Sequence, residues 1–358
     1  MAIKFAGAHH VTAIAGDPQD NVDFYAGILG LRLVKKTVNF DDPSSYHLYY
    51  GDAGGNPGTI MTFFSWPGAP RGRSGAGQIG ATSFAVPEDS LGYWTQRLVE
   101  HGVRFGAPAR RFDETVLTFE DPDGLGIEIV ARPGLDAASG SWAGSTVPTE
   151  HAVRKISGVT LLEADPSRTE ELLSNFLGFE KVGEEEGRVR YATEGARPSR
   201  TSSPCRTGRG ADRGRDDAPR RLARAGRRDR GGLARRGRDA RPRRHPVLDR
   251  QYFHSIYFRE PGGVLFEIAT DPPGFAVDED PEHLGEELKL PPWLERHRDR
   301  IEASLPPSVS RKRRRSSRGE RALGVRAPLR AGRGGRPEHP APPARHGGNE
   351  DDLLPSDA

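Results

Sequence analysis

The sequence contains very little cysteine and methionine, and it has no long apolar run. Its 358 residues include one cysteine, Cys205, and two methionines. A single cysteine excludes a framework of disulfide bonds and fits a reducing compartment. No apolar run reaches the about 18 residues that a membrane-spanning helix needs, and the N-terminus lacks the layout of a signal peptide. The sequence therefore predicts a cytoplasmic protein that does not bind membranes.

Arginine, glycine and proline are abundant, and many of them gather in residues 197–244 and 311–345. The formal net charge is only +3, because the rest of the chain is mildly acidic. A disordered basic segment that binds nucleic acid or an anionic surface is one interpretation of such runs. The first run, however, lacks aromatic residues and interrupts a repeated pattern where a strand is needed. We therefore predict no nucleic-acid partner.

Outside these runs, two sequence patterns occur twice. Residues 121–131 read DPDGLGIEIVA and residues 260–270 read EPGGVLFEIAT, each an acid, a proline, a glycine-containing turn and a strand with a glutamate between apolar residues. Upstream, HVTAIAGD (10–17) matches GVTLLEAD (158–165), and a helical stretch that ends in Leu-Gly follows each copy. This duplication predicts paired structural modules.

The spacing of apolar residues predicts an α+β fold of tandem βαβββ modules that form two incomplete barrels. In the first module, residues 18–29 form an amphipathic helix closed by Gly30, and strands are expected at 31–39, 46–51 and 59–65. The expected divisions are an N-terminal domain of two modules (1–131), a linker (132–150), a C-terminal domain of two modules (151–271), a covering tail with one short helix (272–306) and a disordered tail (307–358).

The arginine-rich segment 197–245 is expected to be disordered and to result from a reading-frame error, because GC-rich codons read out of register give Arg, Gly, Ala and Pro. One permitted codon choice for Arg215 to Asp229, read one base later, gives ATMHHVAWRVPDDE. This peptide has the pattern of a strand with paired histidines, and its ending VPDD mirrors VPED at 86–89, where the second module leaves the same strand. The interruption therefore replaces the first strand of the fourth module.

A second frame slip is expected after about residue 306. Codons for Glu338 to Gly347, read two bases later, can give NTLLLLHGTG, which leads into GNEDDLLP at 348–355. The combined stretch LLLLHGTGGNEDDLLP resembles the first strand and oxyanion loop of carboxylesterases of the α/β-hydrolase fold. No nucleophile elbow follows. We interpret this tail as part of a neighbouring gene and expect no esterase activity.

His9, His10 and Glu267 are the candidate metal-site residues. Successive side chains of a strand alternate in direction, so one of the two histidines faces the concave side of its sheet and the other faces away. In VLFEIA, Glu267 shares one face with Leu265 and Ala269. A carboxylate between bulky apolar neighbours needs a compensating charge or several hydrogen bonds. A metal ion would supply that charge, and so would a salt bridge to an arginine such as Arg250. One inward-facing histidine of the first strand, one histidine of the shifted-frame pair and Glu267 together give two histidines and one carboxylate. This is the ligand set of non-haem Fe(II) sites.

The two halves of the duplication are not equivalent. Gly158 stands where His10 stands in the first module, and Ala81 stands where the shifted frame places a histidine. Only one complete metal site can therefore be assembled, from His10, Glu267 and the lost histidine. Glu128 is the duplicated counterpart of Glu267 and is expected to lie on an inward-facing strand without a metal.

Two long segments, about 1–195 and 246–306, resemble the ring-cleaving dioxygenases of the vicinal oxygen chelate (glyoxalase/bleomycin-resistance) superfamily, and within it the hydroquinone 1,2-dioxygenase branch. The motifs that carry the resemblance are the HHxT start, the YHLYY-G-PGT-MT run and the RxYFxSxYxRxPGGVxFE run. The resemblance implies an Fe(II)-dependent enzyme whose partners are a small aromatic substrate and O₂.

The resemblance also implies roles for individual residues. His10 and Glu267 would be Fe(II) ligands, and four further residues would surround them, namely His9, Thr12, Arg250 and Tyr257. Tyr257 would transfer protons or serve as an ordinary barrel tyrosine, and Arg250 would hold developing negative charge or pair with Glu267. The family's second histidine ligand has no counterpart here, so we expect impaired activity. Neither His245 nor His254 lies on the proper strand to replace it.

Two other functions stay open. A glyoxalase-like lyase or isomerase would use a different divalent metal and would act without O₂. A module of the bleomycin-resistance type would bind a small molecule without a metal or a reaction. The sequence does not specify an oligomeric state.

Overall fold

The computed structural model describes residues 5, 7–135, 141–193, 205–209 and 246–307, with the backbone alone for 205–209. The expected disordered tail and most of the arginine-rich run lie outside these residues, so the predictions for them stay predictions. Among the described residues, no helix is long and apolar enough to span a membrane.

The first module has one helical segment between its first two strands. Its elements are β1 (His10–Ala15), α1 (Pro18–Val22), the π-helical turn η1 (Asp23–Ile28), β2 (Arg32–Val38), β3 (Tyr46–Gly51) and β4 (Ile60–Ser65). The helix begins after Asp17, whose carboxylate accepts hydrogen bonds from two backbone amides of the first turn. It ends before Gly30, whose φ of 72° other residues rarely adopt. The strand order is β1-β4-β3-β2, with β1 parallel to β4.

The second and third modules share one eight-stranded sheet, ordered β10-β11-β12-β9-β5-β8-β7-β6. The second module contains β5 (Gln78–Pro87), η2 (Glu88–Ser90), α2 (Leu91–Glu100), β6 (Ala109–Arg111), β7 (Glu114–Glu120) and β8 (Gly126–Arg132). The third contains η3 (Thr149–His151), β9 (Lys155–Glu163), α3 (Ser167–Glu171), η4 (Leu172–Phe176), β10 (Glu180–Glu185), β11 (Arg188–Ala192) and β12 (Cys205–Arg209). Antiparallel pairing of β5 with β9 joins the two modules, so this sheet crosses the expected domain boundary.

One strand, β12, lies inside the arginine-rich run, where the sequence predicted none. β12 pairs parallel with β9 and antiparallel with β11. The first two modules repeat this arrangement, because in each the first strand lies parallel to the last. β12 is therefore the last strand of the third module.

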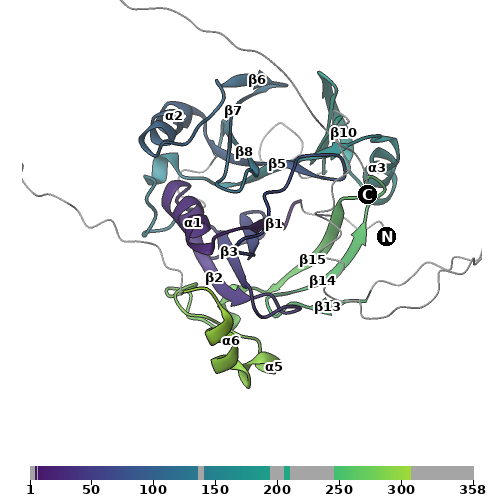
Figure 1. Ribbon diagram of the computed structural model, residues 1–358. Helices are drawn as coiled ribbons and strands as arrows, with labels where there is room; N and C mark the ends of the chain where they lie inside the picture. The colour runs from purple at the N-terminus through teal and green to yellow at the C-terminus, as the bar shows by residue number, and fades with distance from the viewer. Residues whose placement is uncertain (1–4, 6, 136–140, 194–204, 210–245, 308–358) are drawn as a thin grey trace, which may run out of the picture. The chain divides into compact units, whose positions relative to one another are not determined.

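The fourth module contributes three antiparallel strands, β13 (Leu248–Asp249), β14 (Phe253–Arg259) and β15 (Leu265–Pro273). Figure 1 shows β14 and β15 in green beside the purple strands of the first module. Tyr257 of β14 lies directly opposite Glu267 of β15. Within the described part of the chain, no strand pairs with the other side of β15, and no sheet closes into a barrel.

An aromatic cluster seats the fourth module on the first. It joins β2 and β3 to the segment before β14 and to the tail, and its buried members are Val34, Tyr49, Ile60, Tyr252, Phe253, Phe275 and Leu284. A larger apolar cluster packs the helices of the first two modules against their sheets around Tyr25, Phe63 and Trp94. The site described below lies beside the aromatic cluster.

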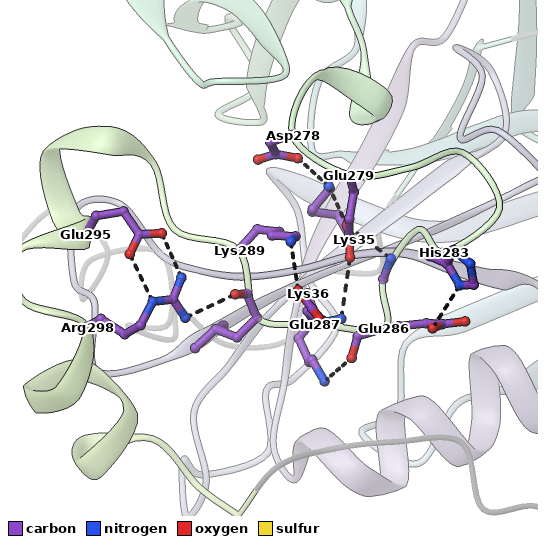
Figure 2. Close-up of polar contacts among 12 residues, drawn as sticks. Lys35, Lys36, Asp278, Glu279, His283, Glu286, Glu287, Lys289, Glu295 and Arg298 are labelled. Atoms are coloured by element: carbon purple, nitrogen blue, oxygen red, sulfur yellow. Dashed lines mark hydrogen bonds and ion pairs between the residues drawn. The ribbon is translucent and has the colours of Figure 1, made fainter.

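The covering tail lies along β2 and is held there by polar contacts (Figure 2). It contains η6 (Phe275–Val277), α5 (Pro292–Glu295) and α6 (Arg298–Ser304), so two short helices replace the single helix that was predicted. The Arg32 guanidinium donates to two tail carbonyls at 2.8 and 2.7 Å. Gly285, with a φ of 78°, approaches β2 so closely that a Cβ would lie 1.9 Å from the Leu33 carbonyl oxygen.

Lys35 is the central residue of this contact. Its side chain is fully buried, and its Nζ donates to Asp278 and Glu279, each at 2.6 Å. The ammonium group also lies 5.1 Å from the centroid of the Tyr252 ring. The Tyr252 hydroxyl donates to the other Asp278 oxygen at 3.1 Å. One buried cation thus connects β2, the fourth module and the tail.

We expect Lys35→Met to lower the free energy of unfolding by about 3–5 kcal/mol, because it leaves two acids at a buried position without their cation. The matched control is Lys181→Met, since Lys181 forms an ion pair with Glu184 whose side chains are 48% and 62% exposed. An exposed pair of this kind contributes little to stability, because solvent screens its charges. Urea unfolding measures both. Equal losses in the two variants would show that the buried contact does not hold the tail.

Candidate functional site

His10 and Glu267 lie 257 positions apart in the sequence and meet between β1 and β15. The distance from His10 Nε2 to Glu267 Oε2 is 3.0 Å. Only 6% of the His10 side chain and 16% of the Glu267 side chain are exposed. The structure thus brings together the two residues that the sequence singled out as ligands.

Glu267 accepts hydrogen bonds from its own sheet as well as from His10. Its Oε1 accepts from the Tyr257 hydroxyl at 2.7 Å and from the Ser255 hydroxyl. Burial alone would raise the pKa of Glu267, but the hydrogen bonds from His10, Ser255 and Tyr257 hold it below its usual value. Glu267 is therefore a largely buried carboxylate, and among the described residues no lysine or arginine forms an ion pair with it.

Tyr257 connects Glu267 to Arg250. The Arg250 Nε donates to the Tyr257 hydroxyl at 3.2 Å, and another nitrogen of the guanidinium lies 3.3 Å from Asp41. Arg250 thus reaches Glu267 through Tyr257. Burial, followed by the charge of Glu267, raises the pKa of Tyr257 to about 12. Tyr257 keeps its proton at neutral pH.

His9 supports His10 from the side away from Glu267. The two Nδ1 atoms lie 2.9 Å apart, so one ring donates to the other. Phe253 packs against both rings, with centroids 5.3 and 5.1 Å away. Burial, followed by the charge of His10, lowers the pKa of His9 to about 4, which keeps the ring neutral. A histidine that binds a metal through one nitrogen is typically held by a hydrogen bond at the other.

A cavity of about 260 Å³ opens beside His9. Aromatic and polar side chains both line it, and they include Tyr252, Phe253, Phe275, Asn56 and Asp271. This volume is near the lower limit of small-molecule sites. A small cavity therefore lies beside His9, the neighbour of His10.

Sequence reasoning missed a hydrogen-bonded row on the face of the first module that carries His10. The Tyr49 hydroxyl lies 2.9 Å from His47 Nδ1, and His47 Nε2 lies 2.7 Å from the Thr62 hydroxyl. Thr62 donates to Thr12 at 3.4 Å, which connects the row to β1. The alternation of polar rings in YHLYY is the signal that could have identified His47 and Tyr49.

The His10–Glu267 pair fits a metal ion in part. Two neighbouring ligands of an octahedral ion with bonds of about 2.1 Å lie about 3 Å apart, and His10 Nε2 and Glu267 Oε2 have this separation. Within the described ranges, however, no group of three or more His, Cys, Asp or Glu side chains is placed to hold an ion. His254 is exposed on β14, and His245 lies outside the described residues. The described residues therefore offer two candidate ligands, His10 and Glu267.

Glu128, the duplicated counterpart of Glu267, is buried on β8 and has different partners. The Ser83 hydroxyl donates to one of its oxygens at 2.5 Å, and Arg111 forms an ion pair with the other. Gly158 of β9 pairs with Ser83 of β5. In the repeat, Gly158 is the counterpart of His10. A guanidinium therefore occupies the neighbourhood in which the first site has a histidine.

Comparisons with known proteins identify relatives of this chain. Residues 7–129 match the family model described as the glyoxalase/bleomycin resistance protein/dioxygenase superfamily. A Bacillus subtilis protein with the provisional name ring-cleaving dioxygenase MhqO is 46% identical over 323 residues, which cover 86% of this chain and 98% of that protein. The chlorohydroquinone/hydroquinone 1,2-dioxygenase of Sphingobium indicum is 35% identical over 318 residues, covering 83% of this chain and 95% of that protein.

A solved structure shows the same fold. It is a crystal structure of a Bacillus subtilis protein provisionally described as a dioxygenase, with 42% identity, a TM-score of 0.73 and coverage of 87% of this chain and 100% of that chain. The expected α+β fold of βαβββ modules and the expected resemblance to ring-cleaving dioxygenases are both confirmed.

We expect His47 to make the protein less stable in acid. Burial, followed by the charges of His10 and Arg250, holds the pKa of His47 well below its usual value. Because an unfolded histidine has a pKa of about 6.5, the unfolded chain takes up a proton below that pH while folded His47 resists it. Between pH 6.5 and pH 5 this difference removes up to about 2 kcal/mol of stability.

The measurement is urea unfolding at pH 7.5 and pH 5 for the original chain and for His47→Gln. The variant should lose less stability on acidification. The control is His283→Gln, at an exposed position, which should leave the dependence on pH unchanged. An identical loss in the original chain and in His47→Gln would contradict the prediction.

Proposed function

Because this chain belongs to the glyoxalase/bleomycin resistance protein/dioxygenase superfamily, we propose that its fold serves the Fe(II)-dependent cleavage of a hydroquinone-type ring by O₂, and that the chain as written is impaired. The His10–Glu267 pair carries the proposal. Its separation suits two ligands of one ion, and its members correspond to one histidine and the carboxylate of the three-ligand set of non-haem Fe(II) sites. The name of the Sphingobium relative supports the substrate class.

The surrounding residues have distinct tasks in this proposal. His10 and Glu267 would hold Fe(II), which when bound lowers the pKa of a substrate hydroxyl and allows electrons to pass to oxygen. His9 fixes the orientation of the His10 ring. Tyr257 keeps its proton near neutral pH, so it can donate that proton to an oxygen of the substrate. Arg250 donates a hydrogen bond to the Tyr257 hydroxyl, and it stabilises the negative charge that develops on that hydroxyl oxygen during proton transfer.

We propose that the third ligand is the histidine lost at the interruption, and the intact half of the duplication indicates where it belongs. Across β5 and β9, Ala81 pairs with Thr160. Ala81 corresponds to the lost histidine, and Thr160 corresponds to Thr12. Among the described strands, β1 pairs with β4 alone and β15 with β14 alone. The lost histidine thus belongs on a strand between β1 and β15, opposite Thr12.

Restoring the reading frame through 197–245 should produce a protein that binds one Fe(II) per chain and consumes O₂ with a hydroquinone. The chain as written should do neither, because a site that lacks one of three ligands loses most of its affinity and its fixed geometry. Metal analysis and oxygen uptake after anaerobic iron loading measure both properties. Equal turnover by the two proteins would mean that another group completes the site in the chain as written.

The same experiment separates the alternatives. Turnover of substrate without O₂ by the restored protein would indicate a lyase or isomerase. Binding of a small aromatic molecule by both proteins, without metal and without a reaction, would indicate a binding module.

In the frame-restored protein, Tyr257→Phe should lower kcat by about 10²–10⁴-fold, the usual contribution of a positioned acid or base. Its iron content should stay unchanged, because the hydroxyl is bonded to a ligand and is not a ligand itself. Glu267→Gln is the contrasting variant, and it should lose iron. Oxygen-uptake kinetics and metal content of each variant test this. Full activity in Tyr257→Phe would assign Tyr257 a purely structural role.

A further inference from the structure

Two strands with unpaired edges lie next to each other at the candidate metal site. Among the described strands, β1 pairs with β4 alone and β15 pairs with β14 alone. Nevertheless, His10 of β1 and Glu267 of β15 are in contact at 3.0 Å. Figure 1 shows β15, in green, on the side of its sheet toward β1. A gap without a backbone ladder therefore separates β1 from β15.

In the other half of the protein, a strand fills the equivalent gap. β9 is the counterpart of β1, and β8 is the counterpart of β15. Between them lies β5, which pairs antiparallel with β9 and parallel with β8. Ser83 of β5 pairs with Gly158 on one side and with Glu128 on the other. The gap between β1 and β15 thus has the place of one strand, antiparallel to β1 and parallel to β15.

Side chains beside this gap are exposed. Ile14 of β1 and Leu265 of β15 are 39% and 52% exposed, although both are large and apolar. They lie on the same strand faces as His10 and Glu267, respectively. Thr12 is exposed as well, whereas its counterpart in β9, Thr160, is buried beside β5. The borders of the gap therefore have apolar surface that an added strand would cover.

We propose that the gap between β1 and β15 is a strand-addition site, which binds the missing first strand of the fourth module as a separate peptide. This inference rests on the place that the proposed function gives to that strand. An extended peptide in the gap forms a ladder of hydrogen bonds with each of the two edges. It also buries Ile14 and Leu265, so backbone pairing and apolar contact both favour its binding.

The shifted-frame peptide ATMHHVAWRVPDDE has the pattern that this gap requires. Its VPDD ending aligns it with β5 through VPED at 86–89, so its second histidine takes the place of Ala81 and its second alanine takes the place of Ser83. The alanine then lies between His10 and Glu267, where a small side chain leaves the two in contact. The second histidine is two residues away on the same strand face.

The first test uses the full chain without iron and the fluorescein-labelled peptide ATMHHVAWRVPDDE. Fluorescence anisotropy measures binding, and we expect one saturable site per chain. A second peptide has proline in place of the valine that follows the histidines. It should bind at least about ten-fold more weakly, because a strand that is paired on both edges has no position for a residue without a backbone N–H.

A variant of the chain tests whether the peptide lies beside β15. Leu265→Ser should weaken peptide binding roughly five- to ten-fold, because the added strand then buries no apolar side chain at that position. The matched control is Val99→Ser, since Val99 is 63% exposed on α2, outside the two modules that border the gap. This variant should bind the peptide as tightly as the original chain does.

Hydrogen exchange locates the bound peptide without any variant. The peptide should slow the exchange of those amides in residues 10–15 and 265–270 that are not bonded to β4 or β14. It should leave β6, an edge strand of the eight-stranded sheet, unchanged. Slow exchange of the same amides before the peptide is added would mean that another segment fills the gap, and a rise with chain concentration would identify a second copy. Either result would overturn the proposal.

The proposal is also wrong if the peptide does not bind, or if the proline peptide or Leu265→Ser gives equal binding. Iron loading of the complex tests the proposed function separately. The bound peptide should bring one Fe(II) per chain and O₂ uptake with hydroquinone. A peptide with glutamine in place of both histidines should bind as tightly and bring no iron. Specific binding of both peptides without iron would support the strand-addition site and contradict the proposed function.

Discussion

A carboxylate held between strands away from water must be paired or hydrogen-bonded, and both halves of this protein are arranged around that requirement. Glu267 receives hydrogen bonds from hydroxyl groups and from His10, so its negative charge stays available for a cation. Glu128, at the equivalent place, meets the permanent positive charge of Arg111. The identity of the neighbours, rather than the position of the glutamate, separates a potential metal site from an ion pair.

Local and repeated features could be predicted from the sequence, whereas contacts made by tertiary packing could not. The helix before Gly30 and the strands of the first module follow from apolar spacing and turn residues. The pairing of His10 with Glu267 came from the duplication and the family resemblance, because no spacing rule links residues so far apart. The sequence of the strand that carries His47 has no feature that marks a site, and only the packing of the folded chain shows which face of that strand is buried. β12 has no apolar alternation, and its backbone pairing alone reveals it.

The two pairs of modules are joined in different ways. A backbone ladder between β5 and β9 joins the second module to the third. Among the described residues, no ladder joins the first module to the fourth, and side chains hold them together through the aromatic cluster, the His10–Glu267 contact and Lys35. Among the described residues, the half that carries the candidate metal site is therefore joined by side chains rather than by a backbone ladder.

The contact of Lys35 with the tail has a consequence for the way the chain is synthesised. Asp278 and Glu279 follow Lys35 by 243 and 244 positions. At about 5–20 residues per second, a ribosome needs roughly 10–50 s to add the intervening residues. During that interval Lys35 has neither Asp278 nor Glu279 to pair with. The apolar side chains beside it are not yet covered by the fourth module and the tail. The contacts of Lys35 can therefore form only after translation has passed the arginine-rich run and reached Glu279.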